Sequence, residues 1–265
     1  GKALKKNVAR NQVVIASKVY FNEGRLSRQA IMREIDGTLS RLGTDYLDLY
    51  IIHRFDYDTP IEETMEALHD LVKAGKVRAL GASAMYGYQF YNMQLAARDN
   101  GWTPFSAMEN HYNLLYREDE RELLPICKQM KVSLMPYSPL AAGHLARPQW
   151  KSESLRGTTD RVAMGKYDKT EAEDMQIVKR VAELAEKYNC KMSQIAIAWQ
   201  WAKGILSPII GATKTQYLDD SAGAFDIKLT AEDLAYLEEP YVPHEIVGAI
   251  DKNPAQGVIL LDEKK

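Results

Sequence analysis

The feature that most constrains the fold of this chain is a regular alternation of short apolar runs with longer amphipathic segments. The short runs are apolar at almost every position, which is typical of strands buried on both faces of a parallel sheet. In the longer segments apolar residues recur every three or four positions, the spacing of one helix face. Repeated strand–helix units predict βαβ connections on a parallel sheet. We predict strands over residues 13–18, 48–53, 77–83, 105–111, 132–139 and 207–211.

Helix boundaries can be predicted from residues that cap helices. A helix should begin near Ser27 and end at Gly43, because serine is a common N-cap and glycine a common residue just past a helix end. Thr59, Pro60 and Glu62 form the pattern of a capping box with proline at the first helical position, so the next helix should begin there.

Two α/β architectures fit the alternation: an open doubly wound sheet and a (β/α)8 barrel, also called a TIM barrel. The G-x-G-x-x-G turn of a dinucleotide-binding open sheet is missing after the first strand, and the sequence holds no P-loop. We therefore predict the barrel, although it needs eight strands and the sequence shows six. All of residues 1–265 are assigned to this single domain, with a long polar loop near residues 143–169.

The charge balance argues against several classes of partner. The 34 basic and 36 acidic residues give a net charge of −2 and form no long cationic block, so we expect no nucleic acid partner. No apolar run is long enough for a membrane span, so we expect no membrane partner. Cys127 and Cys190 lie far apart without a C-x-x-C partner, which argues against disulfides or a metal site and fits a reducing, cytoplasmic location.

Polar side chains stand at the carboxyl ends of the predicted strands, which ring one mouth of a barrel. These residues are Lys18, His53, Ser83, Glu109 and Tyr137. A single histidine at the end of an apolar strand is more often a hydrogen-bonded core residue, and a lysine there can reach out to solvent. The coincidence of several such residues nevertheless predicts a functional site at this mouth.

The segment that follows the last predicted strand has the composition of a phosphate site. Gly211, Thr213 and Lys214 precede a helix, so free backbone N–H groups, a hydroxyl and a cation would meet there. An ordinary strand–helix turn with an exposed lysine fits equally well. Tyr137 offers a flat ring on which an aromatic group can stack. Together with Lys18 and His53, these residues point to a dinucleotide cofactor.

At this point the chain resembles the aldo-keto reductase superfamily, in the variety of bacterial-type reductases related to potassium-channel β subunits. The resemblance implies an α/β (β/α)8 TIM barrel that uses NADPH to reduce aldehydes or ketones, so the partner would be a small carbonyl substrate. An alternative within the resemblance is a regulatory or redox-sensing subunit that binds NADPH without turnover. The similar segments are residues 15–19, 46–56, 75–83, 111–114, 136–140 and 208–214.

The resemblance also implies roles for individual residues. Lys18 matches the family lysine that lowers the pKa of a catalytic tyrosine, and His53 matches the histidine that orients and polarises the carbonyl group. Ser83 matches a serine that binds the nicotinamide carboxamide, and Tyr137 matches the residue stacked on the nicotinamide ring. The remaining cofactor positions are Glu109, Ser138, Leu140 and Gly143 near the nicotinamide and pyrophosphate, and Gly211, Thr213, Lys214 and Asp220 near the adenosine 2′-phosphate.

Three departures from the family pattern stand out. Glu109 replaces a glutamine, and an ionised carboxylate can only accept hydrogen bonds. Lys214 replaces an arginine, so the 2′-phosphate would meet a point charge. The family aspartate and tyrosine precede the lysine, whereas residues 1–17 contain neither type. We therefore expect two strand–helix units, about 60 residues, to be missing before Gly1 and residues 1–265 alone to have little activity.

Overall fold

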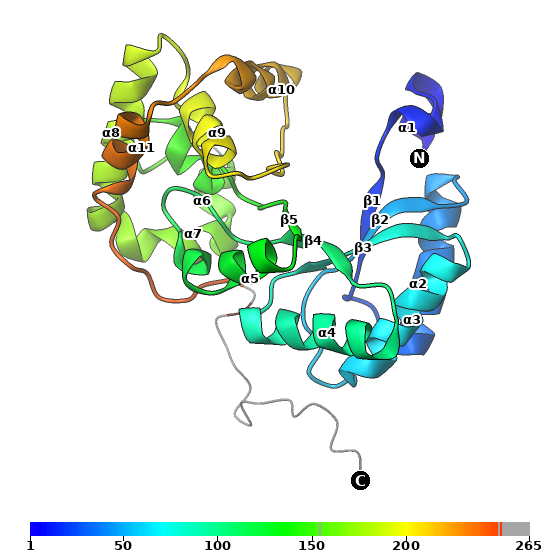
Figure 1. The fold of residues 1–265 in the computed structure, drawn as a ribbon. Helices are drawn as coiled ribbons and strands as arrows, with labels where there is room; N and C mark the ends of the chain where they lie inside the picture. The colour runs from blue at the N-terminus through cyan, green and yellow to red at the C-terminus, as the bar shows by residue number, and fades with distance from the viewer. Residues whose placement is uncertain (154, 249, 251–265) are drawn as a thin grey trace. The chain divides into compact units, whose positions relative to one another are not determined.

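A computed structural model describes residues 1–153, 155–248 and 250 (Figure 1). The chain divides into two compact units. The first unit contains Gly1–Glu109 and Ile126–Val132, and the second contains Asn110–Pro125 and the described residues from Ser133 onward. The single domain predicted for residues 1–265 stays a prediction.

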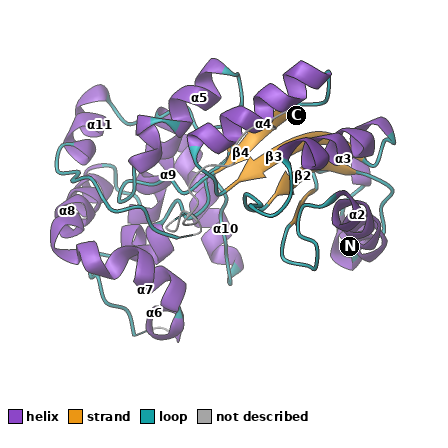
Figure 2. Ribbon diagram, turned by 90° about the horizontal axis from the view of Figure 1, so that it is seen from below, coloured by secondary structure: helices purple, strands orange, loops and turns teal. Residues whose placement is uncertain are grey.

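The first unit is built on a parallel sheet in which neighbouring strands follow the order of the chain. Each pair of strands is joined by a helix, and Figure 2 shows these helices beside the sheet. This is the α/β arrangement that the sequence predicts, and it is the arrangement of successive strands in a (β/α)8 barrel. The strands are β1 (Ala16–Val19), β2 (Leu47–Ile52), β3 (Val77–Ser83) and β4 (Phe105–Glu109), and the helices are α1 (Lys2–Asn7), α2 (Arg28–Leu42), α3 (Ile61–Lys73) and α4 (Gly87–Asn100).

The boundaries of α2 follow from its end residues, as predicted. Ser27 is the N-cap, and its hydroxyl accepts a hydrogen bond from the backbone N–H of Ala30. Gly43 ends the helix with φ of 68°, a left-handed conformation that favours glycine. Ile31 and Ile35 lie on one face of the helix, and both are completely buried.

The predicted capping box of α3 is wrong. Pro60, not Thr59, is the N-cap residue, and no side chain caps the helix. The hydroxyl of Thr59 instead donates a hydrogen bond of 2.7 Å to the buried carboxylate of Asp56. A hydrogen bond to the carboxylate three residues earlier therefore replaces the predicted N-cap bond.

The second unit is mainly helical and has its own apolar core. Its largest fully buried side chains include Trp199, Tyr112 and Tyr167, which pack with Ile177 and Ile195. Its strand β5 covers Ser133–Leu134, and α5 (Leu123–Gln129) has residues in both units. The other helices are α6 (Leu155–Thr159), α7 (Arg161–Tyr167), α8 (Glu171–Lys187), α9 (Met192–Ala202), α10 (Thr215–Ala222) and α11 (Ala231–Glu238).

Two predictions for the second unit are wrong. Residues 207–211 form no strand, and the one backbone hydrogen bond recorded for them runs from Ile209 N to Pro136 O at 2.9 Å. Pro208 lacks the N–H that a strand ladder needs. The polar loop predicted near residues 143–169 contains α6 and α7, and Asp160 caps α7 by accepting from the backbone N–H of Ala163.

None of the helices in the described part of the chain combines the length and apolar character that a membrane crossing needs.

Candidate functional site

The centre of the site in the first unit is an ion pair that spans the sheet. Lys18 Nζ, on β1, lies 3.0 Å from Glu109 Oε2, at the end of β4. Strands lie about 4.8 Å apart, so on a flat sheet β1 and β4 would be separated by roughly 14 Å. Contact between the two side chains therefore requires a curved sheet with both residues on its concave face, as in a barrel.

Two of the three residues in the same register row as Lys18 are small. The strand register aligns Lys18 with Ile51, Ile51 with Gly81, and Gly81 with Ala107. A Cβ atom at Gly81 would lie 3.0 Å from Ile51 Cγ1, which is closer than normal packing. Gly81 has no side chain and Ala107 only a methyl group, so these two positions add little bulk to the face of the sheet that carries Lys18 and Glu109.

Burial dominates the electrostatics of Glu109. Its side chain is 7% exposed, whereas that of Lys18 is 30% exposed. Loss of solvent raises the pKa of Glu109, and the hydrogen bond and charge of Lys18 offset only part of that rise. Glutamate at position 109, where the family pattern has glutamine, thus supplies an acidic partner for Lys18.

His53 follows directly after β2, where its backbone N–H continues the ladder by donating to Val19 O at 3.0 Å. Burial lowers the pKa of His53, and the nearby positive charges of Lys18 and Arg54 lower it further. The imidazole is therefore neutral at pH 7 and keeps one N–H donor. Within residues 1–153, 155–248 and 250 the His53 ring makes no hydrogen bond, so the donor can serve a ligand.

Ser83 completes the group in the first unit. It is the last residue of β3, it is 1% exposed, and the strand register aligns it with Glu109. Lys18, His53, Ser83 and Glu109 thus come from the carboxyl-terminal parts of four adjacent parallel strands. The structure brings these predicted residues together on one unit, and the remaining predicted residues belong to the second unit.

In the second unit, the ring of Tyr137 stacks on that of His111, with centroids 5.3 Å apart and an interplanar angle of 5°. Tyr116 also stacks on His111, at 4.2 Å. His111 Nε2 lies 2.8 Å from the hydroxyl of buried Tyr167, and burial lowers the pKa of His111 well below its usual value. These contacts fix the plane of Tyr137, whose ring also lies 4.7 Å from Lys166 Nζ.

Ser138, Leu140 and Gly143 lie on one tightly turned segment that follows Tyr137. Ser138 has φ of 57°, a left-handed conformation that is uncommon for residues with a side chain and is often found at functional loops. Gly143 has φ of 98°, and a Cβ atom there would lie 2.8 Å from Arg147 Nη1. The backbone conformation therefore favours glycine at this position, whereas the guanidinium group is the end of a flexible side chain and could move aside.

Gly211, Thr213 and Lys214 lie on an exposed segment that leads into α10. Lys214 Nζ is 5.8 Å from the ring centroid of Tyr217, itself 45% exposed. Asp220, on α10, forms an ion pair of 2.5 Å with Lys191. The first three residues thus present backbone, hydroxyl and cation to solvent, whereas the Asp220 carboxylate already has a cationic partner.

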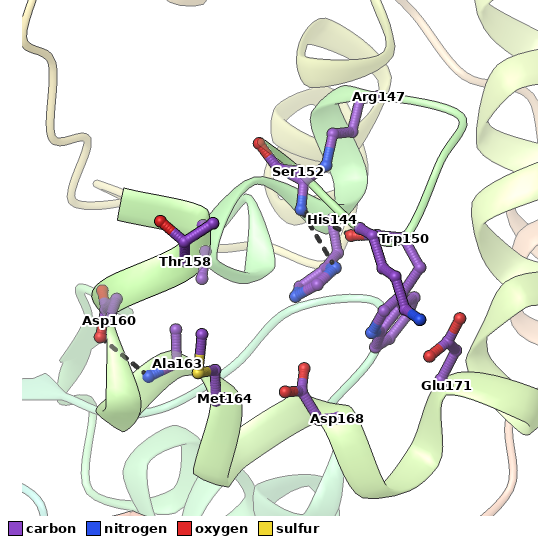
Figure 3. A pocket seen from close by; sticks show the side chains of 13 residues that line it. His144, Arg147, Trp150, Ser152, Thr158, Asp160, Ala163, Met164, Asp168 and Glu171 are labelled. Carbon is purple, nitrogen blue, oxygen red and sulfur yellow. Dashed lines mark hydrogen bonds between the residues drawn. The ribbon is translucent and has the colours of Figure 1, made fainter. Parts of the chain in front are cut away.

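A cavity of about 460 Å³ in the second unit was not predicted from the sequence (Figure 3). The rings of His144 and Trp150 stack at its wall, 4.0 Å apart, and Arg147 Nη2 donates to Trp150 O at 2.8 Å. Asp168 and Glu171 lie on another side of the cavity. Its residues come from several short helices, so no compact sequence motif marks it.

The buried ring of His144 predicts a pH dependence of stability. Burial lowers the pKa of His144 to about 4, and the charge of Arg147 contributes. The unfolded chain therefore takes up this proton first, and the folded state loses stability as the pH falls from about 6.5 through about 4. In the unaltered protein, His144 should lower the free energy of unfolding by on the order of 2–3 kcal/mol between pH 7 and pH 4.5. His144→Phe keeps an aromatic ring beside Trp150 but cannot take up a proton, so urea unfolding of this variant should not show that decrease. An unchanged pH slope in the variant would contradict this assignment.

No cluster of three His, Cys, Asp or Glu side chains suited to a metal ion occurs in the part of the chain that the structure describes.

Comparison with known proteins identifies similar sequences. The model of the aldo/keto reductase family matches residues 1–241. An aldo-keto reductase of Fusarium vanettenii is 47% identical over 88% of this chain and 62% of its own length. The versiconal hemiacetal acetate reductase of Aspergillus parasiticus is 42% identical over 93% of this chain and 79% of its own length. A putative aryl-alcohol dehydrogenase of Schizosaccharomyces pombe is 44% identical over 86% of this chain and 64% of its own length.

A solved structure is also similar. The crystal structure of a thermostable aldo-keto reductase, Tm1743, in complex with the inhibitor epalrestat matches with a TM-score of 0.72 and 28% identity. The match covers 90% of this chain and 75% of that one. The chain spans less than two thirds of the Fusarium and Schizosaccharomyces relatives. The three sequence relatives named above are fungal, so the resemblance holds for the family as a whole and not specifically for the bacterial-type and channel-β variety.

Proposed function

The chain belongs to the aldo/keto reductase family, and from this premise we propose that the protein uses NADPH to reduce an aldehyde or ketone to an alcohol. The observation that carries the proposal is the neutral His53 donor beside the Lys18–Glu109 pair at the carboxyl-terminal ends of parallel strands. In barrel enzymes this end of the strands carries the chemistry.

The two basic side chains suit the charge that develops in carbonyl reduction. When hydride adds to a carbonyl carbon, negative charge grows on the oxygen, and bound NADPH would supply that hydride from C4 of its nicotinamide. The N–H of His53 can donate to this oxygen and stabilise the charge. The ammonium group of Lys18 can lower the pKa of a nearby phenol, which is the role that the family resemblance assigns to it. In that scheme the phenol would donate its proton to the oxygen and complete the alcohol.

The Lys18–Glu109 pair adds a feature to this scheme. Glu109 holds the Lys18 ammonium on the concave face of the sheet, and Lys18 in turn keeps a buried carboxylate ionised more easily than burial alone would allow. The Glu109 carboxylate would accept hydrogen bonds from the N–H groups of a nicotinamide carboxamide. Ser83, on the adjacent strand, could supply a hydroxyl to the same carboxamide.

The second unit offers groups that suit the rest of NADPH. The ring of Tyr137, fixed by His111, would stack on the nicotinamide. Ser138, Leu140 and Gly143 would surround the pyrophosphate. Gly211, Thr213 and Lys214 would bind the adenosine 2′-phosphate, because exposed donors and a cation favour a dianion. Asp220, already paired with Lys191, would accept a hydrogen bond from a sugar hydroxyl. Its negative charge would keep it away from the phosphate groups.

Steady-state kinetics of the full-length protein test this proposal. We expect loss of NADPH absorbance with aromatic aldehydes or methylglyoxal-like compounds from a broad panel of carbonyl substrates. Tight NADPH binding without turnover of any substrate would contradict the enzyme assignment. It would instead fit a protein that binds the cofactor for regulation or redox sensing.

A further inference from the structure

An exposed phenylalanine lies against the proposed catalytic histidine. Phe21 is 64% exposed and follows β1 by two residues. Single exposed apolar side chains are ordinary on protein surfaces. This one contacts the ring of His53, with centroids 4.9 Å apart and an interplanar angle of 77°. A ligand that accepts the His53 N–H would therefore come close to the Phe21 ring.

The ring of Phe21 is fixed although it is exposed. Tyr20 contacts it edge to face, with centroids 5.2 Å apart. The guanidinium carbon of Arg54 lies 5.0 Å from its centroid, within the range of cation–π attraction. Tyr20, His53 and Arg54 thus all contact the ring, and more than half of the residue stays open to solvent. A rigid, open aromatic surface binds without a large loss of side-chain entropy.

The chemistry of this surface favours an aromatic ligand. A ring that packs against Phe21 gains an aromatic pair contact in addition to buried apolar area. No ion pair of Arg54 is recorded among the described residues, so its charge is also available to attract the face of an aromatic ring. A small aliphatic carbonyl compound can use His53 equally well but has too little surface to cover Phe21.

We propose that Phe21 determines the substrate class of this site by favouring aromatic aldehydes over small aliphatic ones. The carbonyl oxygen of the substrate faces His53, and its aromatic ring packs on Phe21 beside Arg54. This inference rests on the proposed carbonyl reduction. It adds a specificity residue that touches the substrate away from the reacting carbon.

The test compares benzaldehyde with propanal in the full-length protein. We expect Phe21→Ala to lower kcat/KM for benzaldehyde roughly tenfold or more, because the substrate ring loses its apolar contact. The value for propanal should stay within about twofold. Phe21→Tyr should retain the preference for benzaldehyde, since it keeps the ring. Phe225, 63% exposed and stacked on Trp201, offers a matched control, and Phe225→Ala should leave both values unchanged.

Each other outcome is decisive. Equal losses for both aldehydes in Phe21→Ala would overturn the inference, because they would show that Phe21 only supports His53. Unchanged values for both aldehydes would also overturn it. If the unaltered protein reduced neither compound nor any other carbonyl, the proposed function would fail and the inference with it. If the unaltered protein reduced carbonyl compounds but Phe21→Ala kept the same ratio of kcat/KM for benzaldehyde to kcat/KM for propanal, the inference alone would be refuted.

Discussion

Replacement of Lys18 by methionine is expected to lower kcat/KM for carbonyl reduction by about two to four orders of magnitude. Methionine keeps the length and apolar stem of the side chain but removes the ammonium group. The site then loses a positive charge that acts on His53 and that, in the proposed mechanism, would lower the pKa of a phenolic proton donor. The measurement is the steady-state rate of NADPH oxidation with an aldehyde that the unaltered protein reduces.

The same substitution leaves Glu109 without its partner, so a structural effect must be separated from the chemical one. An unpaired carboxylate that is 7% exposed destabilises the fold, here by on the order of 2 kcal/mol because Lys18 is partly exposed. The double variant Lys18→Met/Glu109→Gln removes this unpaired charge. It should regain stability in urea unfolding and should not regain activity.

A matched control lies on the same unit. Lys76 forms an ion pair with Asp36 at 2.5 Å, and the two side chains are 36% and 62% exposed. Lys76→Met should leave the reduction rate unchanged, since exposed ion pairs contribute little. A Lys18→Met variant that kept a rate within about threefold of the unaltered protein would show that Lys18 has no part in the chemistry.

Replacement of Lys214 by alanine should weaken NADPH binding by roughly ten- to a hundredfold and leave NADH binding nearly unchanged. The two cofactors differ only in the 2′-phosphate, so a cation that contacts this group discriminates between them. Lys214 is exposed at the start of α10, where a phosphate could reach it. Titration of both reduced cofactors by nicotinamide fluorescence gives the two dissociation constants.

Two further variants sharpen this result. Lys214→Arg should retain NADPH affinity, because a guanidinium group can bind the phosphate with two hydrogen bonds. Lys228, whose Nζ donates to the Phe225 carbonyl oxygen, lies on the same unit, and Lys228→Ala should affect neither cofactor. Equal losses of NADPH and NADH affinity in Lys214→Ala would refute the assignment of Lys214 to the 2′-phosphate.

The elements that could be predicted from sequence are those whose signals are local. The bounds of α2 follow from Ser27 and Gly43, and the apolar run predicts a strand over residues 48–53, within one residue of β2 at each end. The common location of Lys18 and His53 could be predicted because parallel strands place their carboxyl ends at one edge of a sheet. These inferences need only chain connectivity and the pattern of apolar residues.

The features that could not be predicted depend on contacts between distant residues. The Lys18–Glu109 pair requires the curvature of four strands and the space left by Gly81, neither of which a pattern in one segment records. The Thr59 case is different, because two local signals compete there: its hydroxyl fits a capping box, but the carboxylate of Asp56, three residues earlier, binds it instead. Short helices such as α6 and α7 carry weak local signals, because packing and not propensity stabilises them.

Transfer of an isotope label from the cofactor tests the central claim most directly. The full-length protein would be given an aromatic aldehyde and NADPH that carries deuterium at the transferred position of nicotinamide C4, and the product would be analysed by mass spectrometry. Hydride transfer predicts an alcohol with one deuterium on the former carbonyl carbon. Formation of unlabelled alcohol, or no alcohol despite bound NADPH, would contradict direct reduction of the carbonyl group at this site.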